Sequence, residues 1–186
     1  MNKAFVKDDD AWEDPELIRD PHADIPPGSR NYMTPAGAIR LRDRLHDLVN
    51  IERPAIEERL NDCSSGGQDE DKGKTRELRK KRRRIDNEID FLKVRLSQTE
   101  AVDPPSQNCE VVRFGATVTV QPETGPEKIY QIVGIDETDV VKGLISWTSP
   151  LAVALLNARA GDVVKVVTPG GVDELEIMDL KYGEIE

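Results

Sequence analysis

The part of the chain best able to do chemistry is an acid-rich segment, Gly66-Gly67-Gln68-Asp69-Glu70-Asp71. Carboxylates are ligands that Mg²⁺ prefers, usually together with water and phosphate oxygens. The segment begins like a calcium loop at Asp69, but Lys80 stands where such a loop needs its bidentate acid. Because the chain offers no cage of its own, we expect these carboxylates to complete a site of another macromolecule. This favours an accessory protein over an enzyme.

The histidines and cysteines form no catalytic or metal-binding pattern. His22 and His46 have no plausible nucleophile partner, and Cys63 and Cys109 belong to no CxxC motif. The sequence has no apolar N-terminal leader and no run near the roughly 18 apolar residues of a membrane span. We therefore expect a soluble, cytoplasmic protein with reduced thiols.

Two amphipathic helices are predicted to position the acidic segment. The first should begin at Thr34-Pro35, because Thr is a good N-cap and Pro is tolerated at the first helical position. Its apolar residues recur every three or four positions from Leu41 to Leu60, with an interruption at Pro54. From Leu78 to Leu96 the second helix has the seam spacing of a coiled coil.

Together the two patterns predict an antiparallel coiled-coil hairpin over residues 31–102. Matching the apolar positions places the turn near Gly67 and sets Glu52 opposite Arg82, so we expect these two charges to pair across the seam. About 28 residues per arm correspond to a length of about 40 Å. A hairpin of that length can carry its tip into a deep channel.

The net charge of −10 hides one strongly cationic stem. Lys72 to Arg84 contains nine Lys/Arg and one acid, whereas residues 114–186 contain five Lys/Arg and twelve acids. The unbroken run from Lys80 to Arg84 surrounds its helix with charge, which favours salt-dependent contact with phosphates or acidic walls. No aromatic residues accompany it for base stacking. The residues expected to contact nucleic acid are Arg76, Arg79, Lys80, Arg83 and Arg84.

Beyond a predicted linker at residues 103–110, short alternating runs indicate strands. One helix interrupts them, with Ser149 as its N-cap and Pro150 in its first turn. The fold class is therefore α+β: a helical hairpin followed, over residues 111–186, by a small antiparallel sheet with one helix. Residues 1–30 are rich in Asp and Pro and are predicted to form a disordered acidic tail.

Several collinear segments resemble the Gre family of bacterial transcript-cleavage factors, and its GreB branch in particular, over about residues 32–182. They are Glu52-Arg53-Pro54, Arg83-Arg84-Ile85-Asp86, Phe114-Gly115-Ala116, Ile132-Val133-Gly134-Ile135-Asp136-Glu137, Ser149-Pro150-Leu151-Ala152-Val153-Ala154-Leu155-Leu156, Gly161-Asp162 and Thr168-Pro169-Gly170-Gly171. Each segment is weak alone, but their shared order and spacing are specific.

The resemblance implies a monomeric transcription elongation factor whose coiled coil enters the secondary channel of bacterial RNA polymerase. Acidic tip residues, here Asp69, Glu70 and Asp71, would promote cleavage of the nascent RNA 3′ end when polymerase backtracks. Asp69 and Asp71 would help hold Mg²⁺ that is shared with the polymerase active site, so polymerase supplies the catalysis. The C-terminal FKBP-like domain would dock at the channel rim through Trp147, Ser149, Pro150 and Leu151.

At the tip the sequence departs from the Gre pattern of Gly, Asp, two intervening residues and Glu-Asn-Ala. An ungapped match puts Gln68, Asp71, Lys72 and Gly73 at the positions of the Asp, the Glu, the Asn and the Ala. The first acid is therefore missing from its place.

Three interpretations of the sequence stay open. Asp69 and Glu70 can substitute from neighbouring positions, because a Gly66-Gly67 turn is pliable. Alternatively, the tip holds metal unproductively and the chain is an inhibitory secondary-channel regulator of the same fold. The third reading is a nucleic-acid-binding or protein-interaction module unrelated to polymerase, since a basic run before an apolar seam also mimics a basic-zipper DNA binder.

Overall fold

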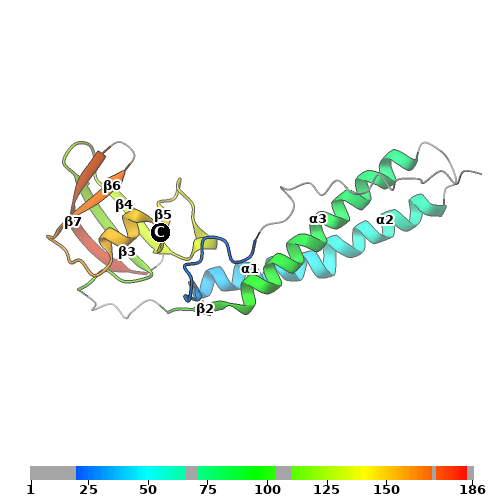
Figure 1. Cartoon of the computed structure of the whole chain (residues 1–186), viewed down its shortest axis with the longest axis horizontal. Helices are drawn as coiled ribbons and strands as arrows, with labels where there is room; N and C mark the ends of the chain where they lie inside the picture. The colour runs from blue at the N-terminus through cyan, green and yellow to red at the C-terminus, as the bar shows by residue number, and fades with distance from the viewer. Residues whose placement is uncertain (1–19, 66–70, 104–109, 169–170, 184–186) are drawn as a thin grey trace, which may run out of the picture. The chain divides into compact units, whose positions relative to one another are not determined.

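The computed structural model describes residues 20–65, 71–103, 110–168 and 171–183 (Figure 1). These residues form two compact units. The hairpin unit comprises Arg44–Val94 with residues 20–23, and the sheet unit comprises Asp24–Asp43 with residues 95–183. We describe each unit by itself.

The hairpin unit is built from helices that continue from the sheet unit. The first arm of the hairpin consists of α1 (Pro35–Asp47), which belongs to this unit from Arg44 onward, a π-helical turn η2 (Leu48–Glu52) and α2 (Arg53–Ser65). The second arm is α3 (Asp71–Ser97), which belongs to this unit as far as Val94. Figure 1 shows α2 and α3 side by side, and ion pairs link the two arms. The buried apolar residues form one seam along both arms: Leu48, Ile56, Ile85, Ile89 and Leu92.

A proline causes the π-helical turn in the first arm. Pro54 has no N–H to donate, and its ring would crowd the carbonyl of residue 50 in an ordinary α-helix. The helix widens instead, and the Arg53 N–H bonds to the carbonyl oxygen of Leu48, five residues earlier. The arm therefore continues past the proline without ending.

The predicted contact between Glu52 and Arg82 is wrong. Glu52 pairs with Arg44 on its own arm, and Arg82 lies 3.8 Å from Asp86 on α3. The prediction extended a regular helical period through Pro54. Because a π-turn holds more residues than an α-turn, side chains near it and beyond it point to a different face.

The sheet unit contains two sheets. Strand β1 (Asn31–Met33) pairs in parallel with β2 (Thr99–Ala101), so the chain just before α1 lies beside the chain just after α3. The larger sheet has five strands in the order β5-β4-β3-β7-β6. Their bounds are β3 Ala116–Pro122, β4 Lys128–Val133, β5 Leu144–Ser146, β6 Val163–Thr168 and β7 Gly171–Tyr182.

The predicted fold class, α+β with a helical hairpin before a small sheet domain, is confirmed, but the sheet is mixed. Strand β5 runs parallel to β4, whereas the other neighbours are antiparallel. A short 3₁₀ helix, η3 (Ile135–Glu137), and a turn ending at Gly143 carry the chain back alongside β4. Gly143 has a φ of 71°, and a Cβ there would lie 2.4 Å from the Ile129 carbonyl oxygen.

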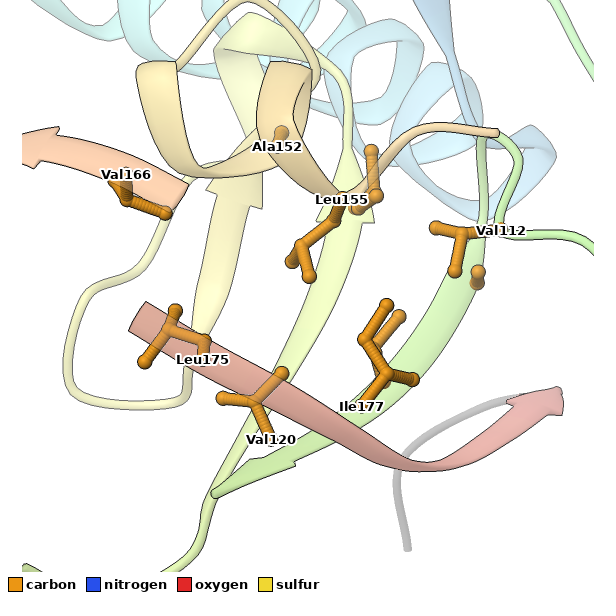
Figure 2. Packing of buried hydrophobic residues seen from close by; sticks show 10 residues of the cluster. Val112, Val120, Ala152, Leu155, Val166, Leu175 and Ile177 are labelled. Carbon is orange, nitrogen blue, oxygen red and sulfur yellow. The ribbon is translucent and has the colours of Figure 1, made fainter. Parts of the chain in front are cut away.

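A hydrophobic core lies between the curled sheet and helix α4 (Pro150–Leu155), as Figure 2 shows. Leu155 and Ala152 point from α4 toward Ile177 and Leu175 of β7. The helix begins as predicted, because the Ala152 N–H donates to the Ser149 hydroxyl oxygen at 3.2 Å. This cap and the core fix the position of the segment around Ser149.

We predict that Leu155→Ala lowers the free energy of unfolding of the C-terminal domain by about 2–5 kcal/mol, since Leu155 is 0% exposed and truncation leaves a cavity. Val153→Ala on the same helix is the control, because Val153 is 60% exposed. Urea unfolding followed by Trp147 fluorescence, in a Trp12→Phe background, measures both. Equal losses from the two variants would contradict the core assignment.

Candidate functional site

The described helices end on either side of the acidic segment. Helix α2 ends at Ser65, and α3 begins at Asp71. Asp69 and Glu70 lie outside the described residues, and Asp71 is the first residue of α3. In the sequence, Asp69 and Glu70 thus fall between the end of α2 and the start of α3.

Within the part of the chain that the structure describes, no group of three or more His, Cys, Asp or Glu could hold a metal ion. That Asp69, Glu70 and Asp71 supply carboxylates to Mg²⁺ stays a prediction from the sequence. Three carboxylates would leave other positions around such an ion for water, phosphate or a second macromolecule.

The predicted nucleic-acid-binding residues share one exposed stripe on α3. Arg76, Arg79, Lys80 and Arg83 follow the i, i+3, i+4, i+7 spacing of a single helix face, and Arg84 adjoins it. The stripe lies opposite the buried seam residues of the same helix. Among the described residues, Arg76, Arg79, Arg83 and Arg84 make no ion pair, so their charge faces outward.

Other charges of the hairpin are neutralised across its arms. Arg44 donates to both oxygens of Glu88, at 2.9 and 3.2 Å, and also bonds Glu52. Hydrogen bonds to Glu88 and then Glu52 raise the pKa of Arg44 above its ordinary value. Arg53 reaches Asp86 on α3 at 2.8 Å. These ion pairs neutralise Glu52, Glu88 and Asp86 near the seam.

The four predicted docking residues lie together at the end of β5 and the start of α4, and three of them also have structural roles. Trp147 packs against the core and makes an edge contact with Tyr32, with ring centroids 5.4 Å apart. Leu151 also packs against the core, and Ser149 caps α4. Pro150 is exposed.

Sequence reasoning missed a buried polar cluster where β1, α1 and η3 meet in the sheet unit. The Glu137 carboxylate, with 2% of its side-chain surface exposed, bonds Thr34, Gly134 and Arg40. Beside it, Asp136 accepts from Asn31 at 2.9 Å and from Arg95 at 2.9 and 3.0 Å. The signal that could have revealed the cluster is Gly37, a helix-disfavouring residue in the first turn of α1.

The comparisons with known proteins cover both units. The family model "Transcription elongation factor, N-terminal" matches residues 31–100, and "Transcription elongation factor, GreA/GreB, C-term" matches residues 106–182. The transcription elongation factor GreB of Neisseria meningitidis serogroup B is 42% identical over 159 residues, which are 85% of this chain and 98% of that protein. The chain belongs to the GreA/GreB family of transcription elongation factors.

A GreA protein agrees with this family assignment. The GreA protein of Maricaulis maris is 37% identical over 81% of this chain and 97% of its own length. The solved structure of GreA factor homolog 1 of Thermus thermophilus aligns with 27% identity and a TM-score of 0.39, covering 81% of this chain and 98% of that one. None of the described helices of this GreA/GreB family member is long and apolar enough to cross a membrane.

We predict that Asp136→Ala destabilises the sheet unit by about 3–5 kcal/mol, because it removes the carboxylate partner of Arg95, whose side chain is 3% exposed. The control is Glu174→Ala, which breaks the exposed pair with Lys165 and should change stability much less. Chemical denaturation measures both changes. Similar small losses would show that the buried pair contributes no more than a surface pair.

Proposed function

We propose that the chain binds bacterial RNA polymerase, inserts its helical hairpin as a coiled coil into the secondary channel, and stimulates cleavage of backtracked RNA. The observation that carries this proposal is the unbroken α3 of 27 residues, which starts at Asp71 and is bound to the other arm by ion pairs. A helix of that length spans about 40 Å. Such a hairpin can carry acids through a channel too narrow for a globular domain.

The acidic tip supplies carboxylates, and polymerase supplies the catalytic site. Asp71, with Asp69 and Glu70, would add ligands to Mg²⁺ in the polymerase active site, and such an ion stabilises negative charge on the reacting phosphate. The chain itself is then not an enzyme. Its own acidic residues would bind and orient a water near the RNA 3′ end and would add negative charge around that water.

Affinity comes from the rest of the chain. In this proposal, the surface around Trp147, Ser149, Pro150 and Leu151 contacts the rim of the channel, where Pro150 is exposed and the core fixes its neighbours. The basic stripe on α3 contacts RNA phosphates or acidic channel walls. The protein acts as a monomer in the cytoplasm, where polymerase transcribes.

We predict that the wild-type protein shortens labelled RNA in stalled, backtracked elongation complexes supplied with Mg²⁺. Asp69→Ala, Glu70→Ala and Asp71→Ala should each be compared with it, and loss of an essential ligand should slow shortening by about 10- to 100-fold or more. Asp90→Asn is the matched control, because Asp90 is an exposed acid of α3 that lies far along the helix from the tip.

Two other outcomes separate the remaining candidate functions. Slower elongation without RNA shortening identifies an inhibitory secondary-channel regulator. The altered tip, with Gln68 and Lys72 in place of the family's Asp and Asn, is also compatible with that function. No effect on elongation, together with no binding to polymerase, would reject both polymerase readings and leave a separate interaction module.

We also predict that Arg79→Gln and Arg83→Gln weaken binding to the elongation complex and reduce its salt dependence. Each removed contact to single-stranded RNA phosphate should lower the slope of log affinity against log salt by about 0.7. Lys93→Gln is the control, since Lys93 lies on the same helix but pairs with Asp90 at 3.9 Å. Unchanged slopes for the stripe variants would remove the stem from the interface.

A further inference from the structure

One carboxylate holds the start of helix α1 from another part of the chain. The Thr34 N–H donates to Glu137 Oε2 at 2.8 Å, and the Thr34 hydroxyl donates to Oε1. The Gly134 N–H donates to Oε2 at 3.0 Å, and Arg40 Nη2 lies 3.2 Å from Oε1. A carboxylate with 2% exposure is stable in its charged form only with such donors.

The bonds of Glu137 to Thr34 take the place of a local capping box at the start of α1. In a capping box, the residue three positions after the N-cap is Glu or Gln, and its side chain accepts the N-cap N–H. Here the N-cap is Thr34, and the third position is Gly37, which has no side chain. The Glu137 side chain takes that role from 103 residues away.

Gly37 and Gly134 make the space for this carboxylate. A Cβ on Gly37 would lie 2.1 Å from Glu137 Oε1, and a Cβ on Gly134 would lie 2.7 Å from Oε2 and 2.6 Å from the Tyr32 carbonyl oxygen. Gly37 also costs α1 helix propensity in its first turn. Both glycines therefore leave room for the Glu137 carboxylate.

The neighbouring residues reinforce the same connection. Asp136 bonds Asn31 of β1 and Arg95 in the last turn of α3, and Tyr32 packs on Trp147. Thus the two ends of the hairpin that belong to the sheet unit both bond to the adjacent acids of η3.

We propose that Glu137 is a positioning residue whose carboxylate joins the root of the hairpin, Asn31–Arg40 with Arg95, to the C-terminal domain. Through this joint, docking of the C-terminal domain also sets the position of the acidic tip. The inference therefore rests on the proposed function. Its loss should leave polymerase binding within about threefold and slow RNA cleavage at saturating factor by about 10- to 100-fold, since small misplacement at a reacting centre has effects of that size.

A double variant separates the joint from simple helix capping. Glu137→Ala removes both the cap and the connection. Gly37→Glu combined with Glu137→Ala returns a capping carboxylate to α1 from its own third position but leaves the connection cut. We expect the double variant to recover the thermal stability lost in Glu137→Ala, while cleavage stays at the level of Glu137→Ala. Recovery of cleavage with stability would overturn the proposal, because capping alone would then explain Glu137.

A measurement without polymerase judges the joint independently. Spin labels at Arg59 on α2 and at Glu123 after β3, in a chain with Cys63 and Cys109 changed to Ser, report the spread of distances between hairpin and C-terminal domain. The wild type should give a narrow distribution, and both Glu137→Ala and the double variant a broad one. Equal widths in all three would overturn the proposal. If the wild type gives a narrow distribution but no RNA shortening, the proposed function fails while the joint stands.

Discussion

The charge of Glu137 constrains the whole root of this molecule. A carboxylate taken out of water must be surrounded by donors, and its donors come from the N-cap of α1, the turn before η3 and Arg40. These groups can meet only if β1 and α1 lie against the segment after β4. Gly37 and Gly134 have no side chains because any Cβ would displace the acid. A helix start, a sheet connection and two glycines are thus fixed by one interaction.

From that root the hairpin extends with few large apolar residues, and electrostatics supports its seam. Arg44 and Arg53 reach across to Glu88 and Asp86, so the cationic excess remains on the opposite face of α3. The π-helical turn lets the first arm pass Pro54 without breaking. A helical pair with a basic outer stripe is compatible with the proposed delivery of carboxylates to nucleic acid held by polymerase.

Local signals predicted much of this fold. Thr34 and Ser149 cap the helices that they were expected to begin, and the short alternating runs expected after the linker form the strands of the larger sheet. The predicted register failed at Glu52 because no sequence period signals a π-turn. The parallel direction of β5 was not predicted because it depends on the crossover through η3, which is a tertiary feature. The bonds from Glu137 to Thr34 and Arg40 could not be predicted, since these two partners lie about a hundred residues away in the sequence. Asp69 and Glu70 remain predicted from sequence alone.

The most direct test of tip delivery replaces Mg²⁺ in the polymerase active centre with Fe²⁺ and generates hydroxyl radicals there. The radicals cut only the polypeptide next to the ion, so end-labelled chains bound to polymerase report which residues reach the centre. The account predicts cuts confined to the neighbourhood of residues 66–71, and their loss when free tip-bearing competitor displaces the chain. Cuts elsewhere on the bound chain, or none, would contradict the claim that the acidic connection enters the active centre.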